Sequence, residues 1–149
     1  MDFQIRINGL DALIDKLQQA PEIAAPILLR ALAASQAILA KYTTRETVPW
    51  RTGFLVQSFQ AVLTPGLLRW YPTASYARFV EFGTAPHVIR PKNARALYWP
   101  GAEHPVRLVN HPGTKPNPYM ERIAAAATPD INEIFDAALS QIVGEIAAQ

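Results

Sequence analysis

The sequence predicts an α+β fold: a small antiparallel β-sheet packed against a long N-terminal helical segment and a C-terminal helix, with long loops. Apolar residues recur at helical spacing near both ends, whereas the middle interrupts short β-prone runs with prolines and glycines. The 149 residues are half hydrophobic and only 17% charged, which suits one core. We expect a single domain over 1–149, divided into an N-terminal strand and helices (about 1–45), a β-rich middle with a long basic loop (about 48–117) and a C-terminal helical segment (about 118–147).

The N-terminal part begins with the pattern of a strand. In "FQIRI", residues 3–7, hydrophobic residues alternate with polar ones, as in a strand with one buried face, and Gly9 ends the pattern. Leucine and isoleucine then recur at helical spacing over residues 10–17. This short helix should stop before Pro21, because proline cannot continue the helical hydrogen bonding.

A second, longer helix is predicted from Pro21 or Pro26 to about Thr43. Its apolar positions keep the helical spacing, so one stripe should face the core. The stripe consists of Ile27, Leu28, Ala31, Leu32, Ser35, Ile38, Leu39 and Tyr42.

The middle of the chain has the pattern of a small antiparallel sheet. The β-prone run at 48–63, the turn signal "TPG" and the run "LLRWYP" at 67–72 predict a hairpin. "SYARFVEFGT" at 75–84 suits a short helix or turn closed by a glycine. Two shorter β candidates follow, "ALYW" at 96–99 and "VRLV" at 106–109.

The segment "HPGTKPNPY", residues 111–119, should connect the last strand to the last helix. Asn117 can cap that helix, and Pro118 suits its first position, where the missing N–H would have been unpaired. We expect a break at Thr128 and Pro129. The apolar stripe of this helical segment consists of Ile131, Ile134, Phe135, Ala138, Ile142 and Ile146.

Charge is unevenly distributed, although the net charge is only +2. Residues 85–118 carry five cations against one carboxylate, which is +4, and residues 119–149 carry one cation against five carboxylates, which is −4. Either these are two solvated faces, or oppositely charged patches meet between subunits and set their orientation. In the second case the candidate subunit-interface residues are Arg90, Lys92, Arg95, Arg107, Lys115, Glu133, Asp136 and Glu145.

Composition and spacing exclude several enzyme classes. Without cysteine the chain can form neither a disulfide nor a thiolate metal site. The three histidines, His87, His104 and His111, are not at spacings that bring two ligands to one metal. Ser58 lacks the glycines of a nucleophile elbow, and Gly113 lies outside any phosphate-loop pattern. We therefore predict no catalytic, metal or cofactor site.

The N-terminus "MDFQIRING" has neither the basic start nor the apolar core of a signal peptide. No apolar run approaches the roughly 20 residues of a membrane-spanning helix. We expect synthesis in the cytoplasm and no membrane partner.

Two patterns leave other functions open. Glu81 lies among aromatic and aliphatic residues, as an acid/base group of a small hydrolase would, but a glutamate beside a glycine turn more often anchors loop amides. The basic residues at 90–95, next to Tyr98 and Trp99, are typical of a nucleic-acid-binding module that combines charge with stacking. Loss of activity in Glu81→Gln, or DNA affinity that falls steeply with salt, would distinguish these functions.

Three segments, in this order, resemble the signature of a tail-component family of long-tailed bacteriophages, often called tail-completion, head-to-tail joining or neck proteins. With the opening "NGLDALIDKL", the resemblance covers nearly the whole chain. The segments are "TGFLVQS" with Thr52, Gly53, Leu55 and Ser58; "YARFVEFGT" with Tyr76, Ala77, Glu81, Gly83 and Thr84; and "HPGTKPNPYM" with His111, Pro112, Gly113, Pro118 and Met120.

The resemblance implies a structural virion protein of the neck or tail, without catalysis or cofactor, made in the bacterial host cytoplasm. It implies a homo-oligomeric ring, six-fold favoured, that links the capsid connector or adaptor to the tail-tube or tail-terminator proteins, with at most weak, non-specific contact to passing DNA. A tail terminator or adaptor subunit of the same region is the alternative within this class.

The resemblance also implies scaffold roles for the motif residues. Gly53 and Gly83 would be backbone turns, Glu81 would anchor the following loop, and residues 111–118 would form a rigid lead into the C-terminal helix. The connection at 90–110 is longer than the simplest family pattern.

Overall fold

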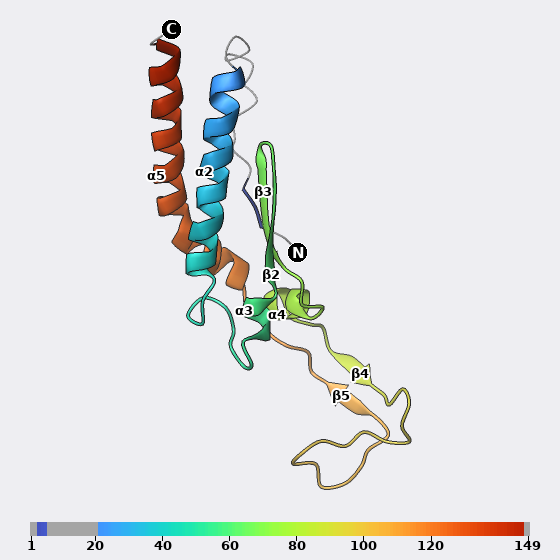
Figure 1. Ribbon diagram of the computed structural model, residues 1–149. Coiled ribbons are helices and arrows are strands. Elements are labelled where there is room, and N and C mark those ends of the chain that lie inside the picture. Colours follow the sequence, from blue (N-terminus) through green and yellow to red (C-terminus); the bar gives the residue numbers. More distant parts are fainter. Residues whose placement is uncertain (1–2, 6–20, 148–149) are drawn as a thin grey trace. The chain divides into compact units, whose positions relative to one another are not determined.

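The computed structural model describes residues 3–5 and 21–147 (Figure 1). The predicted helix at 10–17 and the end of the predicted N-terminal strand lie outside the described residues. The chain divides into two compact units: unit 1 comprises residues 1–77 and 119–149, and unit 2 comprises residues 78–118. The single domain over 1–149 stays a prediction.

Unit 1 contains a pair of long helices, α2 (Pro21–Tyr42) and α5 (Tyr119–Ala147), which lie side by side and antiparallel (Figure 1). The predicted stripes of both helices point into the core they share. Its buried residues are Ala24, Ile27, Leu28, Ala31, Ala138 and Ile142. Both helices are therefore amphipathic in the predicted sense.

The helix α5 passes through Pro129 without ending. The predicted break at Thr128 and Pro129 is wrong, because both residues lie inside one helix of 29 residues. Both are exposed, and Thr128 Oγ1 donates a hydrogen bond to the Ala124 carbonyl (2.7 Å). A proline inside a helix removes one hydrogen bond and bends it. Figure 1 shows α5 changing direction after its orange first turns.

Unit 1 also contains a three-stranded antiparallel sheet in the order β1-β3-β2. Its strands are β1 (Phe3–Ile5), β2 (Phe59–Thr64) and β3 (Leu67–Pro72). In β3, every second residue is buried, including Leu68 and Trp70. The predicted N-terminal strand and the predicted hairpin are both present, and the α+β fold class is confirmed.

The segment just before β2 is helical, which the sequence did not predict. α3 (Phe54–Gln57) is a single turn within the run that we interpreted as β-prone. The backbone of Gly53 has φ 81°, which turns the chain into α3. The Ser58 hydroxyl then donates to the Leu55 carbonyl (2.7 Å), so this turn is held by local bonds.

Tyr119 fastens the start of α5 to the sheet. Its buried ring meets Phe59 edge-on with centroids 6.2 Å apart, and Phe59 stacks on Trp70 at 5.6 Å. The Tyr119 hydroxyl donates to the Ala77 carbonyl (3.2 Å), and Trp70 Nε1 donates to Thr43 Oγ1 (3.0 Å). Aromatic packing with satisfied polar atoms thus joins the sheet to both long helices.

Unit 2 contains α4 (Ala77–Phe82) apart from its first residue, and an antiparallel pair of strands, β4 (His87–Ile89) and β5 (Val109–His111). The predicted short helix closed by a glycine is present, because Gly83 follows α4 with φ 71°.

The strands predicted at 96–99 and 106–109 are wrong in extent. These two segments meet at one bridge pair, Leu97 with Val106, through hydrogen bonds of 2.8 and 3.0 Å. Tyr98 and Trp99 are exposed, so the β-prone side chains have no core in unit 2 to pack on.

By length and composition, α2 could cross a membrane. The expectation that no segment approaches such a span is therefore wrong. Core helices pass the same test, and α2 carries Leu32 and Leu39, both fully buried in unit 1. The absence of a membrane partner stays a prediction.

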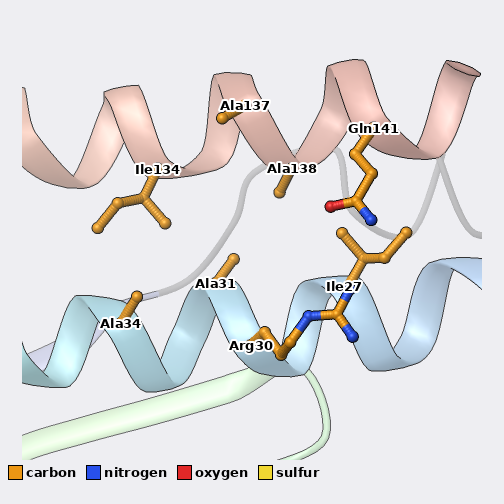
Figure 2. A pocket seen from close by; sticks show the side chains of 8 residues that line it. All are labelled: Ile27, Arg30, Ala31, Ala34, Ile134, Ala137, Ala138 and Gln141. Atoms are coloured by element: carbon orange, nitrogen blue, oxygen red, sulfur yellow. The ribbon is translucent and has the colours of Figure 1, made fainter.

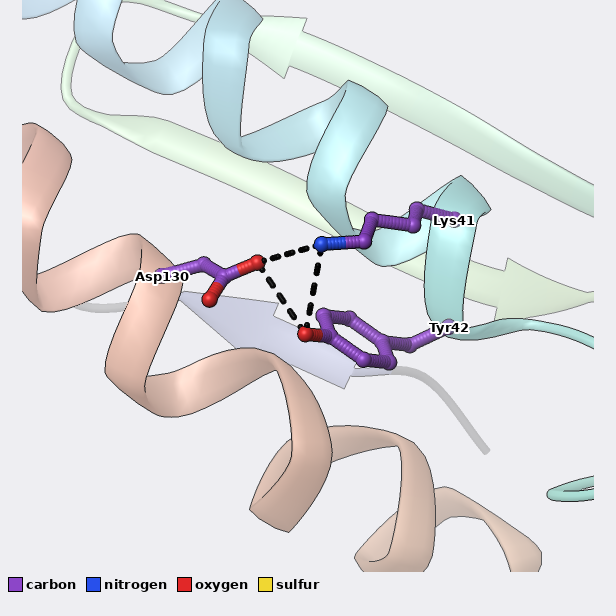
Figure 3. A network of polar contacts seen from close by, with 3 residues as sticks. All are labelled: Lys41, Tyr42 and Asp130. Carbon is purple, nitrogen blue, oxygen red and sulfur yellow. Dashed lines mark hydrogen bonds and ion pairs between the residues drawn. The ribbon is translucent and has the colours of Figure 1, made fainter.

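Figure 3 shows a polar network that links the end of α2 to α5. Lys41 Nζ donates to Asp130 Oδ2 (2.9 Å), and the Tyr42 hydroxyl donates to the same oxygen (3.1 Å). The hydrogen bond from Lys41 is the main cause that lowers the pKa of Asp130, and the same bond raises the pKa of Lys41.

We predict that Asp130→Asn weakens the fold slightly at neutral pH and not at all in strong acid. Because the pKa of Asp130 is lower in the folded protein than in the unfolded chain, its carboxylate stabilises the fold at pH values above the unfolded-state pKa. This stabilisation is lost as the pH falls through the folded-state pKa. Lys41 stabilises the fold at pH values below its unfolded-state pKa. This stabilisation is lost as the pH rises through its higher folded-state pKa. Urea unfolding of both proteins from acid to neutral pH measures the difference, which should be small because the pair is exposed. An equal difference at every pH would contradict this.

Candidate assembly surface

Residues 84–114, which we call the arm, lie within unit 2, and the two ends of the arm meet at one closed base. At the base, the N–H groups of Thr84 and Thr114 donate to each other's carbonyls, both at 3.1 Å. The Thr114 N–H is also 3.0 Å from Thr84 Oγ1, and the two hydroxyls are 3.2 Å apart. The base is therefore fixed by both backbone and side-chain bonds.

A glycine precedes each threonine, and the close approach of the two segments requires both. Gly83 and Gly113 have φ 71° and 86°. A Cβ on Gly83 would overlap the Thr114 carbonyl oxygen, and a Cβ on Gly113 would overlap that of Thr84. The two Gly-Thr pairs thus form a reciprocal clasp, which we call the Gly-Thr clasp.

Above the clasp, His87 and His111 occupy opposite positions of β4 and β5, and their rings stack with centroids 5.0 Å apart. His111 Nδ1 accepts from the Gly113 N–H (3.1 Å), so its neutral form carries the proton on Nε2. His87 Nδ1 lies 2.9 Å from the Ala85 carbonyl and carries the proton there in the neutral form. The stacked histidine rings therefore add a second contact between the two ends of the arm, next to the Thr84–Thr114 pair.

The tip of the arm presents aromatic side chains. The Ala102 N–H donates to the Trp99 carbonyl (3.0 Å), which closes a turn over Pro100 and Gly101, and Gly101 has φ 96°. Proline then glycine at the centre is typical of a type II turn. The turn leaves Tyr98 and Trp99 68% and 46% exposed.

The arm has no core of its own. From residue 82 to 118, all of which the structure describes, no residue is buried. Its four cations, Arg90, Lys92, Arg95 and Arg107, and the adjacent Lys115 are exposed, and none forms an ion pair with another described residue. Exposed apolar side chains beside charges of mostly one sign are typical of candidate interaction surfaces.

The first motif segment lies in unit 1, around α3. Leu55 and Ser58 are buried, whereas Thr52 is exposed. Gly53 approaches the ring of Trp50, a residue that we had not singled out, and a Cβ on Gly53 would lie 2.8 Å from that ring. Gly53 is therefore a turn glycine in the structure, with φ 81°.

The second segment runs through α4 to the clasp. Tyr76 is exposed and its ring lies 6.3 Å from that of Phe54, whereas Ala77 is buried. Glu81 is also buried, and its backbone carbonyl accepts from the Asn117 N–H (3.0 Å). No buried side-chain nitrogen or oxygen in the described residues lacks a partner. The anchoring role of the Glu81 carboxylate stays a prediction.

The third segment supplies the second half of the clasp and the lead into α5. Pro112 and Pro118 are exposed, and Pro118 immediately precedes α5, which begins one residue later than predicted. The Asn117 N–H reaches the carbonyls of both Val80 and Glu81, each at 3.0 Å, so this lead is tied to α4.

The acidic candidates lie along one helix. Glu133, Asp136 and Glu145 are exposed on α5, and none forms an ion pair with another described residue. Gln141 Nε2 donates to Glu145 Oε1 (2.7 Å) one turn away. The helix α5 thus exposes negative charge, and the arm exposes positive charge.

Sequence reasoning missed Thr114 as the partner of Thr84. A signal was present, because "FGT" and "PGT" repeat the same Gly-Thr pair at both ends of the arm. Trp50 carried no comparable signal. Within the described residues, no three or more His, Asp or Glu side chains lie close enough to hold a metal ion.

Comparison with known proteins finds a family match in the first part of the chain. Residues 11–83 match the model of the HK97-gp10-like family, described as "Bacteriophage HK97-gp10, putative tail-component". The match includes the first motif segment and all of the second except Thr84, and it ends at Gly83, where the arm begins. Neither the curated proteins nor the solved structures contain a match to this chain.

Proposed function

We propose that this chain, which over residues 11–83 matches the model of the HK97-gp10-like family of phage tail components, is a ring-forming tail-completion or head-to-tail joining subunit. In this role it is a structural protein of the virion neck, made in the bacterial host cytoplasm. It links the capsid connector or adaptor to the tail tube or its terminator. Six copies are the favoured ring, with no catalysis and no cofactor.

The observation that carries the proposal is the arm. A segment of more than thirty residues with no buried side chain cannot be stabilised by its own packing. The hydrogen bonds at its base hold its two ends together, while Tyr98 and Trp99 are exposed at its tip. Such a segment gains order from a partner in an assembly, as binding loops often do.

A closed ring joins two different faces of neighbouring copies. The arm, with four cations against Glu103, and α5, with exposed Glu133 and Asp136, supply two faces of opposite charge. Opposite charge at an interface fixes orientation and speeds association more than it adds affinity. The motif residues then serve as scaffold, because Gly83 and Gly113 hold the arm and Leu55 and Ala77 belong to the core.

Co-sedimentation with phage tails assembled without this protein tests the proposal. We expect wild-type chain to pellet with tails or with connector-bearing heads, and the double variant Tyr98→Ala, Trp99→Ala to stay in solution. Val62→Ala, which changes an exposed side chain on β2, is the control and should pellet like wild type. Failure of the wild type to pellet with tails, heads or connectors would contradict the proposal.

The same experiment separates the related roles. Binding to the connector alone identifies an adaptor, and binding to the end of the tail tube alone identifies a terminator. The exposed cations and aromatic side chains of the arm also favour a nucleic-acid-binding module as the second candidate. That function predicts tight DNA binding by the isolated chain, falling steeply with salt, whereas a joining subunit binds DNA weakly.

A further inference from the structure

A shallow groove of about 220 Å³ runs between α2 and α5 in unit 1 (Figure 2). Its bed is formed by short or branched aliphatic side chains from both helices. These are Ile27, Ala31 and Ala34 on α2, and Ile134, Ala137 and Ala138 on α5. Because the alanine side chains are short, a large side chain from another molecule can enter the groove and contact both helices.

We propose that this groove receives the aromatic tip of the arm, Tyr98 and Trp99, from a second copy of the chain. The inference rests on the proposed ring, and it identifies the two surfaces through which neighbouring subunits make contact as the arm tip and the groove. Aromatic rings in a water-excluded pocket supply much of the binding energy of protein interfaces. The type II turn at the tip already holds Tyr98 and Trp99 exposed, so little conformational freedom is lost on docking.

Charge complementarity favours a second copy as the occupant. Glu133 lies one turn before Ala137 on the same side of α5, and Glu145 lies one turn after Gln141, which lines the groove. The arm cations closest in sequence to the aromatic pair are Arg95 and Lys92. An arm lying along the groove therefore brings its cations to the unpaired carboxylates of α5.

The only charged side chain that lines the groove among the described residues is Arg30. Figure 2 shows it at the same end as Ile27 and Gln141. A guanidinium beside an aromatic ring is attracted to the face of that ring, most strongly for tryptophan. Arg30 is therefore positioned to cover the face of an inserted Trp99, not to repel the arm.

Cross-linking tests this contact cleanly, because the natural chain has no cysteine. Ala102→Cys, which keeps both aromatic side chains of the tip, and Ala137→Cys chains are mixed and treated with a short bis-maleimide, both in solution and after binding to phage tails. We expect a cross-linked dimer that contains one chain of each kind. The matched control is Val143→Cys, an exposed position on α5 about a third of a turn around the helix from Ala137 and nearly two turns further along it, and it should give no dimer with Ala102→Cys. Glu103→Cys, at an exposed position beside the same turn, replaces Ala102→Cys if the latter does not fold.

A second readout is affinity. Trp99→Ala should weaken self-association by about tenfold or more, the usual effect of removing an interface aromatic. Glu133→Lys should weaken it at low salt and much less at high salt.

The outcomes separate this inference from the proposed function. Oligomers that form or bind tails, but give no dimer with Ala137→Cys, overturn the contact and leave the ring intact. A double-cysteine chain that cross-links only within itself overturns the second copy as occupant. A chain that neither self-associates nor binds tails overturns the proposed function and this inference together.

Discussion

Gly83→Ala should release the base of the arm. The new Cβ would overlap the Thr114 carbonyl oxygen, and the backbone at φ 71° is unfavourable for any residue with a side chain. The backbone term alone costs about 1–3 kcal/mol, and the overlap adds to it. We expect the amides of Thr84 and Thr114, which donate to each other's carbonyls, to exchange their hydrogens at least about tenfold faster. Self-association should fall in parallel.

Gly101→Ala is the matched control. It also has positive φ, 96°, but a Cβ there would meet no atom within 4 Å. It should strain the tip turn while the exchange of Thr84 and Thr114 stays as in the wild type. Equal protection of these two amides in wild type and Gly83→Ala would show that the clasp does not hold the arm.

Leu32→Ala should cause the largest loss of global stability. Leu32 is fully buried on α2, and truncating a buried leucine loses its transfer free energy and leaves a cavity. We expect the free energy of unfolding to fall by about 2–5 kcal/mol, measured by urea denaturation followed by circular dichroism.

Leu29→Ala makes the same chemical change one turn earlier on the same helix. Leu29 is 43% exposed, so we expect a change within about 0.5 kcal/mol. Similar losses in both variants would mean that α2 does not bury the face described here. A large effect of Leu29→Ala on association alone would instead identify Leu29 as part of an interface.

The parts of the fold that depend on local periodicity could be predicted from sequence. The stripes with Ile27 and Leu28 on α2 and Ile142 on α5 are buried as expected, because helical spacing alone determines which residues share a face. The turn that joins β2 and β3 and the glycine after α4 were also predictable, since turns depend on adjacent residues.

The remaining features depend on contacts between distant residues. The clasp pairs Thr84 with Thr114, thirty residues apart, and no local pattern specifies that pairing. Pro129 was predicted to break α5, but the contact of the whole helix with α2 outweighs one lost hydrogen bond. Tyr98 and Trp99 were assigned to a strand because their β propensity is high. In the structure both are exposed, and a strand needs neighbouring side chains on which such residues can pack.

The charged candidates show the same limit. The sequence located positive charge in the middle and negative charge near the end, and the structure adds that both sets are exposed. Which surface meets which is decided by shape as well as by charge. Neither the groove between α2 and α5 nor the turn that presents Trp99 could be derived from charge counts.

The absolute mass of the purified protein, measured by light scattering across concentrations at low and high salt, tests ring formation most directly. We predict a discrete oligomer at low salt, near six copies of the 16.5 kDa chain, whose mass falls as salt screens the contact between the arm and α5. A mass of one chain at every concentration and every salt would contradict a ring-forming subunit with a charged interface.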